Sequence, residues 1–150
     1  AEGRLVLADA VCYARSLGIT KIVDVATLTG AVRAALGQQC IGAFGNDWSF
    51  TEKVIAAGSE VGERIWELPT YDEYSKQYDS DIADIKNSGG AAAGAIIGAM
   101  IIGRFAGEAS WVHLDIAAMS LTNVTKGDQV KGATGSGVRT LISLCESLSL

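Results

Sequence analysis

Histidine, proline and cysteine are scarce in this chain of 150 residues, which has one histidine, one proline and three cysteines. Cys12, Cys40 and Cys145 are an odd number, lie far apart in the sequence and form no CxxC pair. Each cysteine sits in an apolar run, where free thiols are commonly buried. The pattern predicts three reduced, buried thiols and places the protein in the cytoplasm, where disulfides are rare.

Clusters of basic residues are lacking as well. The formal net charge is −5, and no run of lysine and arginine is interleaved with aromatic residues. The electrostatic footprint of a nucleic-acid-binding surface is therefore absent from this segment, and we expect no nucleic-acid partner for it. Hydrophobic residues make up 49% of the chain and charged residues 19%, which indicates one folded domain with a sizeable core.

Uncharged runs of membrane-spanning length are also missing. The longest candidate is SGGAAAGAIIGAMIIG, residues 88–103. A helix needs about 20 apolar residues to cross a bilayer, so this stretch is too short, and we expect no membrane partner. Its alanine and glycine content predicts a helix that is packed closely on all sides by other parts of the protein.

Helical and strand patterns alternate along the chain, which is typical of an α/β fold. The expected helices cover residues 5–17, 31–36, 49–58 (from the capping box Ser49-Phe50-Thr51-Glu52) and 138–148, and the expected strands cover 21–26, 39–44 and 110–117. We expect a mixed, mostly parallel twisted sheet flanked by helices. The strands KIVDVA and SWVHLDIA should be interior neighbours, because their apolar runs suit strands covered on both faces. The last helix is expected to turn five residues inward: Val138, Leu141, Ile142, Cys145 and Leu148.

The stretch TLTG follows an expected strand and precedes an expected helix. Thr27 and Thr29 carry hydroxyl groups, and Gly30 would let a ligand approach the backbone. Ligands of open α/β sheets bind beyond the carboxyl ends of the strands, which is where this stretch falls. By itself the motif is weak, and an ordinary strand-to-helix turn remains the alternative.

His113 and Asp115 lie two residues apart on an expected strand, so they share one face of the sheet. With a serine they could imitate a catalytic triad, but the nucleophile motif GxSxG does not occur in the sequence. A structural histidine is therefore the favoured interpretation of His113.

Six blocks of the chain resemble, in order, signature blocks of the cytosolic leucyl aminopeptidases. They are AEGRLVLADA, KIVDVATLTGA, ERIWELP, ADIKNSGG, WVHLDIA and GATGSGVRTL. The first is similar to the end of the family signature NTDAEGRLxLADA, and the six together extend over essentially the whole chain. The resemblance implies a metal-dependent aminopeptidase that hydrolyses N-terminal residues such as leucine from peptides.

The resemblance also implies which part of the family's protein this chain covers and how that protein assembles. Residues 1–150 resemble the C-terminal portion of the family's catalytic domain, beginning inside the signature. We therefore expect the upstream part of that domain, and a smaller N-terminal domain, to lie outside this chain. The family forms homo-hexamers, and a hexamer is expected for the parent protein.

Metal chemistry is implied for the first residues of the chain. Glu2 matches the glutamate that ligates two divalent ions, which are manganese, zinc or magnesium. Such ions polarise the scissile carbonyl and activate a water. Arg4 matches the catalytic arginine that holds a bicarbonate ion near that water. The other ligands lie upstream in the family, so the chain alone is expected to be inactive.

Substrate contacts are implied for four further residues. Leu28 matches the residue whose backbone carbonyl faces the substrate and the water. The pocket for the N-terminal side chain of the substrate is matched by Thr27, Gly30 and Ala117. Ala118 stands where the family usually has glycine, and Ser120 where some relatives carry a bulkier residue, so the preferred side chain stays open.

Two other classes of function stay open. One is a DNA-binding or scaffold role, since some relatives in the family bind DNA, although the acidic balance of this chain gives it no support. The other is an unrelated α/β hydrolase or nucleotide binder. The missing GxSxG motif, and the missing third glycine after GSG at residues 135–137, argue against it.

Overall fold

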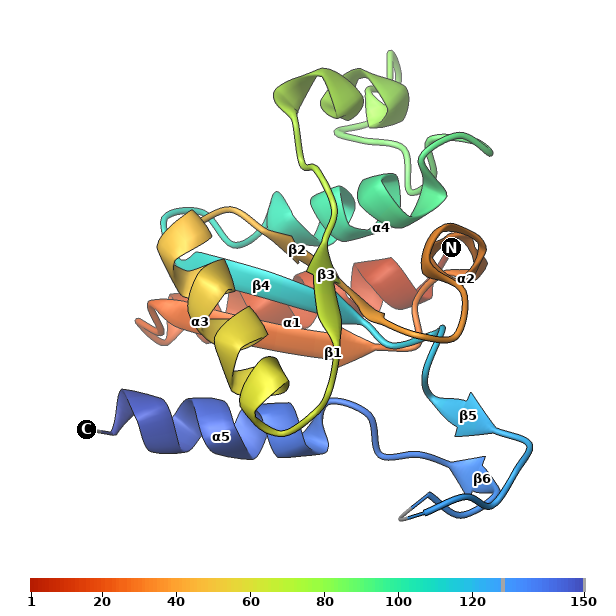
Figure 1. The fold of residues 1–150 in the computed structure, drawn as a ribbon. Helices are drawn as coiled ribbons and strands as arrows, with labels where there is room; N and C mark the ends of the chain where they lie inside the picture. Colours follow the sequence, from red (N-terminus) through yellow and green to blue (C-terminus); the bar gives the residue numbers. More distant parts are fainter. Residues whose placement is uncertain (128, 150) are drawn as a thin grey trace.

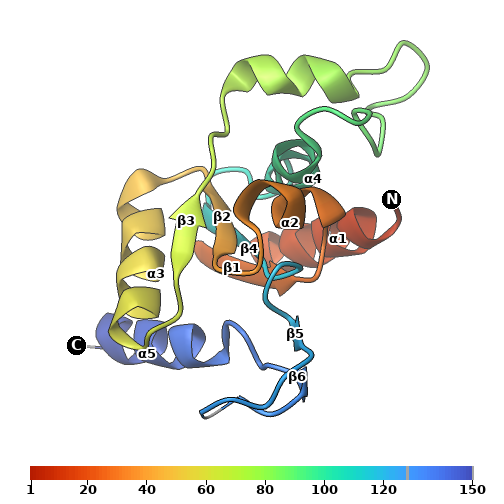
Figure 2. The ribbon, with the colours of Figure 1, turned by 45° about the vertical axis from the view of Figure 1, so that its right-hand side comes forward.

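The computed structural model describes residues 1–127 and 129–149 and shows three layers, with a sheet between two sets of helices (Figure 1). The helices are α1 (Gly3–Ser16), α2 (Gly30–Leu36), α3 (Trp48–Glu60), the 3₁₀ helix η1 (Asp72–Tyr78), α4 (Gly94–Gly103) and α5 (Val138–Leu148). The strands are β1 (Lys21–Ala26), β2 (Ile41–Gly45), β3 (Ile65–Glu67), β4 (Ser110–Asp115), β5 (Leu121–Thr122) and β6 (Gly132–Ala133). Helices α1, α2 and α4 cover one face of the main sheet, and α3 and α5 cover the other (Figure 2).

The main sheet has the strand order β1-β4-β2-β3. β1 runs parallel to β4 and β2 runs parallel to β3, whereas β2 and β4 are antiparallel. The expected mixed, mostly parallel sheet flanked by helices is therefore confirmed. The expected pairing of KIVDVA with SWVHLDIA is confirmed too, in a register that ends with Ala26 opposite Asp115. The expectation that both are interior is wrong for β1, which lies at the edge of the sheet that the described residues form.

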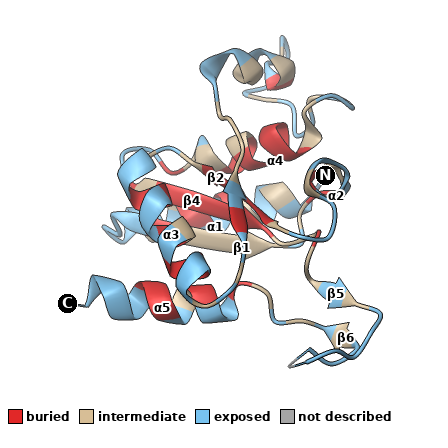
Figure 3. Cartoon of the chain, viewed as in Figure 1, coloured by how far each residue is buried: buried red, intermediate tan, exposed pale blue. Residues whose placement is uncertain are grey.

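Strand β4 is the most deeply buried part of the sheet, because it pairs on both sides and is covered on both faces (Figure 3). Val112 and Leu114 pack among the side chains of the α3 and α5 layer, and Trp111 packs in the core on the α1 and α4 side. Side chains alternate along a strand, so His113 and Asp115 face the same side as Trp111. Both are fully buried, and a buried polar group has to find hydrogen-bond partners.

Helix α4 confirms the expectation of a closely packed apolar helix, and seven of its ten residues are buried. It begins at Gly94, later than the uncharged run suggests, directly after Ala93 in a left-handed conformation. Gly103 lets it lie close to the sheet, because a methyl group built there would sit 2.6 Å from Cζ3 of Trp111. In the described part of the chain, no helix is long and apolar enough to cross a membrane.

The expected inward face of α5 is wrong. Thr140, Ser143 and Leu144 are buried, while Val138 and Ile142 are more than half exposed. The reason is polar contact with the α3 region. Glu63 Oε2 accepts hydrogen bonds from the Thr140 N–H at 2.9 Å and from its hydroxyl at 2.6 Å.

The cysteines are free thiols, as expected, but the expectation that they are buried is wrong. Cys145 is exposed on α5, and Cys12 and Cys40 are half-buried. Cys145 is exposed because α5 buries its Thr140 side, so that the apolar stripe to which Cys145 belongs faces away from the core.

Candidate functional site

Two loops meet where the parallel strands β1 and β4 end. The first is the TLTG turn, residues 27–30, which follows Ala26 and leads into α2. The second is the turn after Asp115, in which the N–H groups of Met119 and Ser120 both donate to the Ile116 carbonyl at 2.8 Å. The carboxyl ends of neighbouring parallel strands are the usual position of a binding site in an α/β sheet, so this is the candidate site.

The buried carboxylate of Asp115 joins the two loops. Oδ1 accepts hydrogen bonds from the backbone N–H groups of Leu28 and Ala117, both at 3.1 Å. Oδ2 accepts from the N–H of Thr29 at 3.1 Å and from its hydroxyl at 2.7 Å. Each oxygen thus receives two donors, which is what an ionised carboxylate with two lone pairs per oxygen can accept.

Thr29 connects this carboxylate to helix α2. It is the N-cap residue of α2, and its hydroxyl oxygen accepts a hydrogen bond from the Val32 N–H at 3.1 Å. The hydroxyl proton goes to Asp115, so the single O–H group serves as donor and acceptor at once. Thr29 is only 8% exposed, so water cannot replace either hydrogen bond, and losing one would lower the stability of the fold.

Arg4 reaches the same region from α1. Its Nη1 donates to the Asn87 carbonyl at 3.1 Å, and burial lowers the pKa of the guanidinium. A methyl group built on Gly98 of α4 would lie 3.1 Å from Thr29 Cγ2 and 3.4 Å from both Arg4 Nη2 and Leu28 Cδ2. Position 98 therefore lies directly against the arginine and the TLTG turn, and glycine there avoids a tight contact with Thr29.

Glu2 stands at the beginning of α1, two residues before Arg4. Its backbone carbonyl accepts hydrogen bonds from Leu5 and Val6, and its side chain is 96% exposed. Nowhere in residues 1–127 and 129–149 do three side chains of His, Cys, Asp or Glu gather in a way that could hold a metal ion. One carboxylate does not fit a two-metal centre, so the residues present cannot form such a centre by themselves.

The structure thus brings Arg4, Leu28 and Ala117 into one region, although their roles stay predictions. Gly30 is the first residue of α2 and is exposed, as is Thr27 at the other end of the turn. Sequence reasoning considered Asp115 only as a possible triad partner of His113 and missed Gly98, because the partners of both come from distant parts of the chain. The position of an aspartate at the end of a buried strand could have pointed to Asp115.

His113 has the structural role that the sequence favoured. Its Nδ1 lies 2.5 Å from Oδ1 of Asp24, whose other oxygen accepts a hydrogen bond from the Trp111 indole at 2.7 Å. The pair fastens β1 to β4 on the face covered by α1 and α4. His113 and Asp115 share a face but do not bond each other, so no triad is formed.

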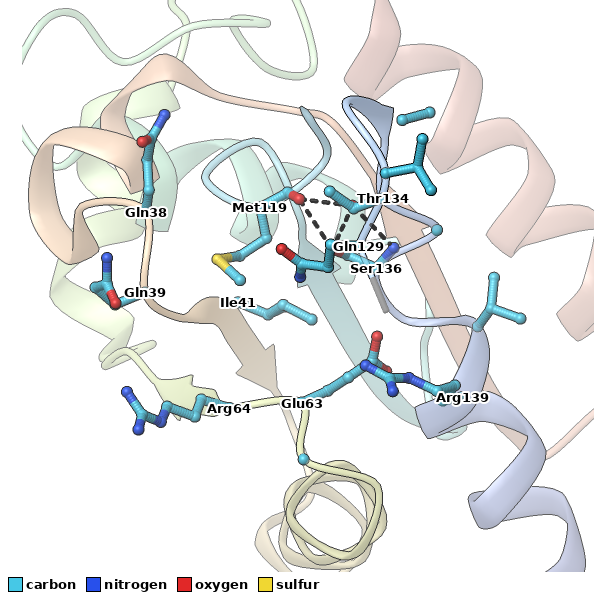
Figure 4. Close-up of a pocket in the computed structure, with 15 residues that line it drawn as sticks. Gln38, Gln39, Ile41, Glu63, Arg64, Met119, Gln129, Thr134, Ser136 and Arg139 are labelled. Atoms are coloured by element: carbon cyan, nitrogen blue, oxygen red, sulfur yellow. Dashed lines mark hydrogen bonds between the residues drawn. The ribbon is translucent and has the colours of Figure 1, made fainter. Parts of the chain in front are cut away.

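A large hollow lies elsewhere, at the start of β2 and beside the loop that leads into α5 (Figure 4). It has a volume of about 770 Å³, and Ile41, Glu63 and Met119 are among the residues that line it. Thr134 and Ser136 fix its wall by donating to the Met119 carbonyl at 2.7 and 3.0 Å. None of the site residues expected from the sequence lines it, and Met119 is the residue that it shares with the turn after Asp115.

Comparison with known proteins gives a consistent family. A sequence model described as "Cytosol aminopeptidase family, catalytic domain" matches residues 1–142. A probable cytosol aminopeptidase of Alkaliphilus metalliredigens is 47% identical over 99% of this chain and 30% of its own length. A second, of Solibacter usitatus, is 50% identical over 96% of this chain and 30% of its own length.

Among solved structures, a tomato leucine aminopeptidase mutant superposes with a TM-score of 0.88 at 41% sequence identity. The match covers 96% of this chain and 28% of the tomato chain. The chain therefore spans about 30% of the length of the curated relatives it matches.

The double role of the Thr29 hydroxyl can be tested by removing it. Thr29→Val keeps the shape of the side chain but leaves the Val32 N–H and one lone pair of Asp115 without a partner. We expect the free energy of unfolding, measured with urea, to fall by about 1–3 kcal/mol. Thr29→Ser retains the hydroxyl and should lose less. Equal losses in the two variants would show that the methyl group, not the hydroxyl, stabilises the turn.

Proposed function

Because the chain belongs to the cytosol aminopeptidase family, we propose that it is the C-terminal portion of the catalytic domain of a metal-dependent aminopeptidase. The whole protein would hydrolyse N-terminal residues such as leucine from peptides. The observation that carries the proposal is the match of the family's catalytic domain over residues 1–142. The meeting of the TLTG turn and Ala117 on Asp115, at the strand ends, supports it.

The strand-end loops are proposed to bind the N-terminal residue of the peptide. The Leu28 carbonyl would face the substrate and the attacking water. The surrounding pocket would be lined by Thr27, Gly30 and Ala117. Leu28 and Ala117 share one carboxylate oxygen as their acceptor, which supports placing them in a single pocket.

Arg4 is proposed to hold a bicarbonate ion that assists proton transfer. A guanidinium group has five N–H donors in a planar fork, which suits a planar anion. Only the bond from Nη1 to Asn87 engages the fork among the described residues, and burial lowers the pKa of the group. Burial disfavours the charged guanidinium, and the negative charge of a bound anion would favour it again.

Glu2 is proposed to supply one ligand to a pair of divalent ions, which would be manganese, zinc or magnesium. The remaining ligands would come from parts of the protein outside these 150 residues, since the described residues do not make a two-metal centre alone. This chain by itself would accordingly be inactive. The name cytosol aminopeptidase, which the relatives carry, supports a cytoplasmic location as part of the proposal.

Glu2 is proposed to act in metal binding and Arg4 in proton transfer, and substitutions in the full-length protein test these two roles separately. Glu2→Ala should lower the metal content measured by elemental analysis and reduce turnover of leucine anilide by several orders of magnitude. Arg4→Ala should keep its metal and lose about 10²–10⁴-fold in kcat, the usual contribution of assisted proton transfer. Added bicarbonate should stimulate the wild type and have little effect on the Arg4 variant.

Glu52→Ala provides the matched control, because Glu52 is an exposed glutamate on α3, away from the strand ends. It should retain wild-type metal content and turnover. A Glu2 variant that keeps both metals and normal rates would contradict the proposed ligand.

We also propose a homo-hexamer for the full-length protein. The apolar helix α4 gives no support, because this chain buries it on its own. Support comes from large apolar side chains left on the surface, among them Trp48 and Trp66, which are 62% and 65% exposed. Light scattering of the full-length protein should give six times the subunit mass, and an active, monodisperse monomer would refute the hexamer.

The alternative of a DNA-binding or scaffold role finds no support. The matched proteins are named as aminopeptidases, and the chain carries a net charge of −5.

A further inference from the structure

We propose that Asp115 is a positioning residue for peptide hydrolysis: it aims the Leu28 carbonyl and fixes the spacing of the two pocket walls, the TLTG turn and Ala117. The inference rests on the aminopeptidase function proposed above. The carboxylate of Asp115 is fully buried, and all four of the hydrogen bonds that it accepts come from these two walls.

The direction of the Leu28 carbonyl follows from a single peptide group. This carbonyl and the Thr29 N–H belong to the same planar unit, in which C=O and N–H point in opposite directions. The Thr29 N–H donates to Asp115 Oδ2 at 3.1 Å, so the Leu28 oxygen points away from the buried carboxylate. Among the described residues no backbone N–H donates to that oxygen, which leaves it able to accept a hydrogen bond from a substrate.

The distance between the two pocket walls is fixed by the other oxygen of Asp115, Oδ1. Oδ1 accepts from Leu28 and Ala117 at the same distance, 3.1 Å, so two segments far apart in sequence are held to one point. Asp115 itself cannot shift easily, because it ends the central strand β4 and is paired with Ala26 on one side and Gly42 on the other. A change in the carboxylate would therefore move both walls relative to each other.

Asparagine is the informative replacement. It has nearly the same size as aspartate, but an NH₂ group takes the place of one oxygen and can only donate. In one orientation of the amide, Leu28 and Ala117 lose their acceptor. In the other, Thr29 loses the acceptor for its N–H and its hydroxyl. In the first case Ala117 loses its bond to the carboxylate, in the second the TLTG turn keeps only the bond from Leu28, and in both the fold of the strand is kept.

The test uses Asp115→Asn in the full-length protein, with anilides of leucine and alanine as probes. We expect kcat to fall about 10- to 100-fold with metal content unchanged, because a small misplacement of a binding group has effects of this size. The ratio of kcat/KM for leucine to that for alanine should change by about tenfold as the pocket wall moves. This ratio does not depend on the fraction of folded enzyme, so a merely structural role would leave it unaltered.

A second readout is independent of activity. Hydrogen–deuterium exchange should quicken in peptides that span residues 27–30 and 116–119 of the Asp115→Asn variant. Asp24→Asn is the matched control, since Asp24 is a carboxylate on the same face of the sheet, bonded to Trp111 and His113. It should lower Tm without changing the leucine-to-alanine ratio. If the Asn variant does not fold, Asp115→Glu takes its place, because it keeps the acceptors but moves them by one methylene.

The outcomes separate the two proposals. A wild type that cleaves no anilide or peptide would overturn the proposed function, while the exchange measurement would still decide whether Asp115 holds the walls. An active wild type with an Asp115 variant of unchanged selectivity and unchanged exchange would overturn the positioning role. That role is also overturned if the Asp115 and Asp24 variants both have a lower Tm but an unchanged leucine-to-alanine ratio of kcat/KM.

Discussion

A buried carboxylate at the end of the central strand is the constraint on which the candidate site depends. Removing the charge of Asp115 from water would cost several kcal/mol unless hydrogen bonds replace its hydration. Two N–H groups of the TLTG turn, the Thr29 hydroxyl and the N–H of Ala117 replace it. Both loops are thereby held in the conformations that direct their donors at one point, and the rest of the pocket follows from that arrangement.

Close helix packing supplies the second requirement of the site. Helix α4 lies close to the sheet at Gly103, where a side chain would collide with Trp111. At Gly98 the helix lies against the Arg4 guanidinium and the TLTG turn, with the tightest contact at Thr29. The apolar, glycine-rich run that resembles a membrane segment in the sequence therefore packs between the sheet, the arginine on α1 and the TLTG turn.

Local patterns predicted the elements well where burial alone decides them. The apolar runs of β1 and β4 gave the correct strands and their pairing, and α5 has the expected bounds. Long-range contacts account for the errors. Ser49 was the expected cap of α3, but Asp47 caps it, in a position where its carboxylate also accepts a hydrogen bond from Ser110 on β4 at 2.6 Å. For the site, the family resemblance led to Leu28 and Ala117, whereas the acceptor that unites them emerged only from the fold.

A crystal structure of the full-length protein with a peptide-like inhibitor that carries a free amino terminus would test the strand-end site most directly. We expect the N-terminal residue of the inhibitor to lie at the ends of β1 and β4. It should contact Ala117 and lie within hydrogen-bond distance of the Leu28 carbonyl oxygen, while Asp115 keeps its four hydrogen bonds. An inhibitor seated in the hollow between Ile41 and Met119, or a Leu28 carbonyl turned away from it, would show that the strand ends are not the binding site.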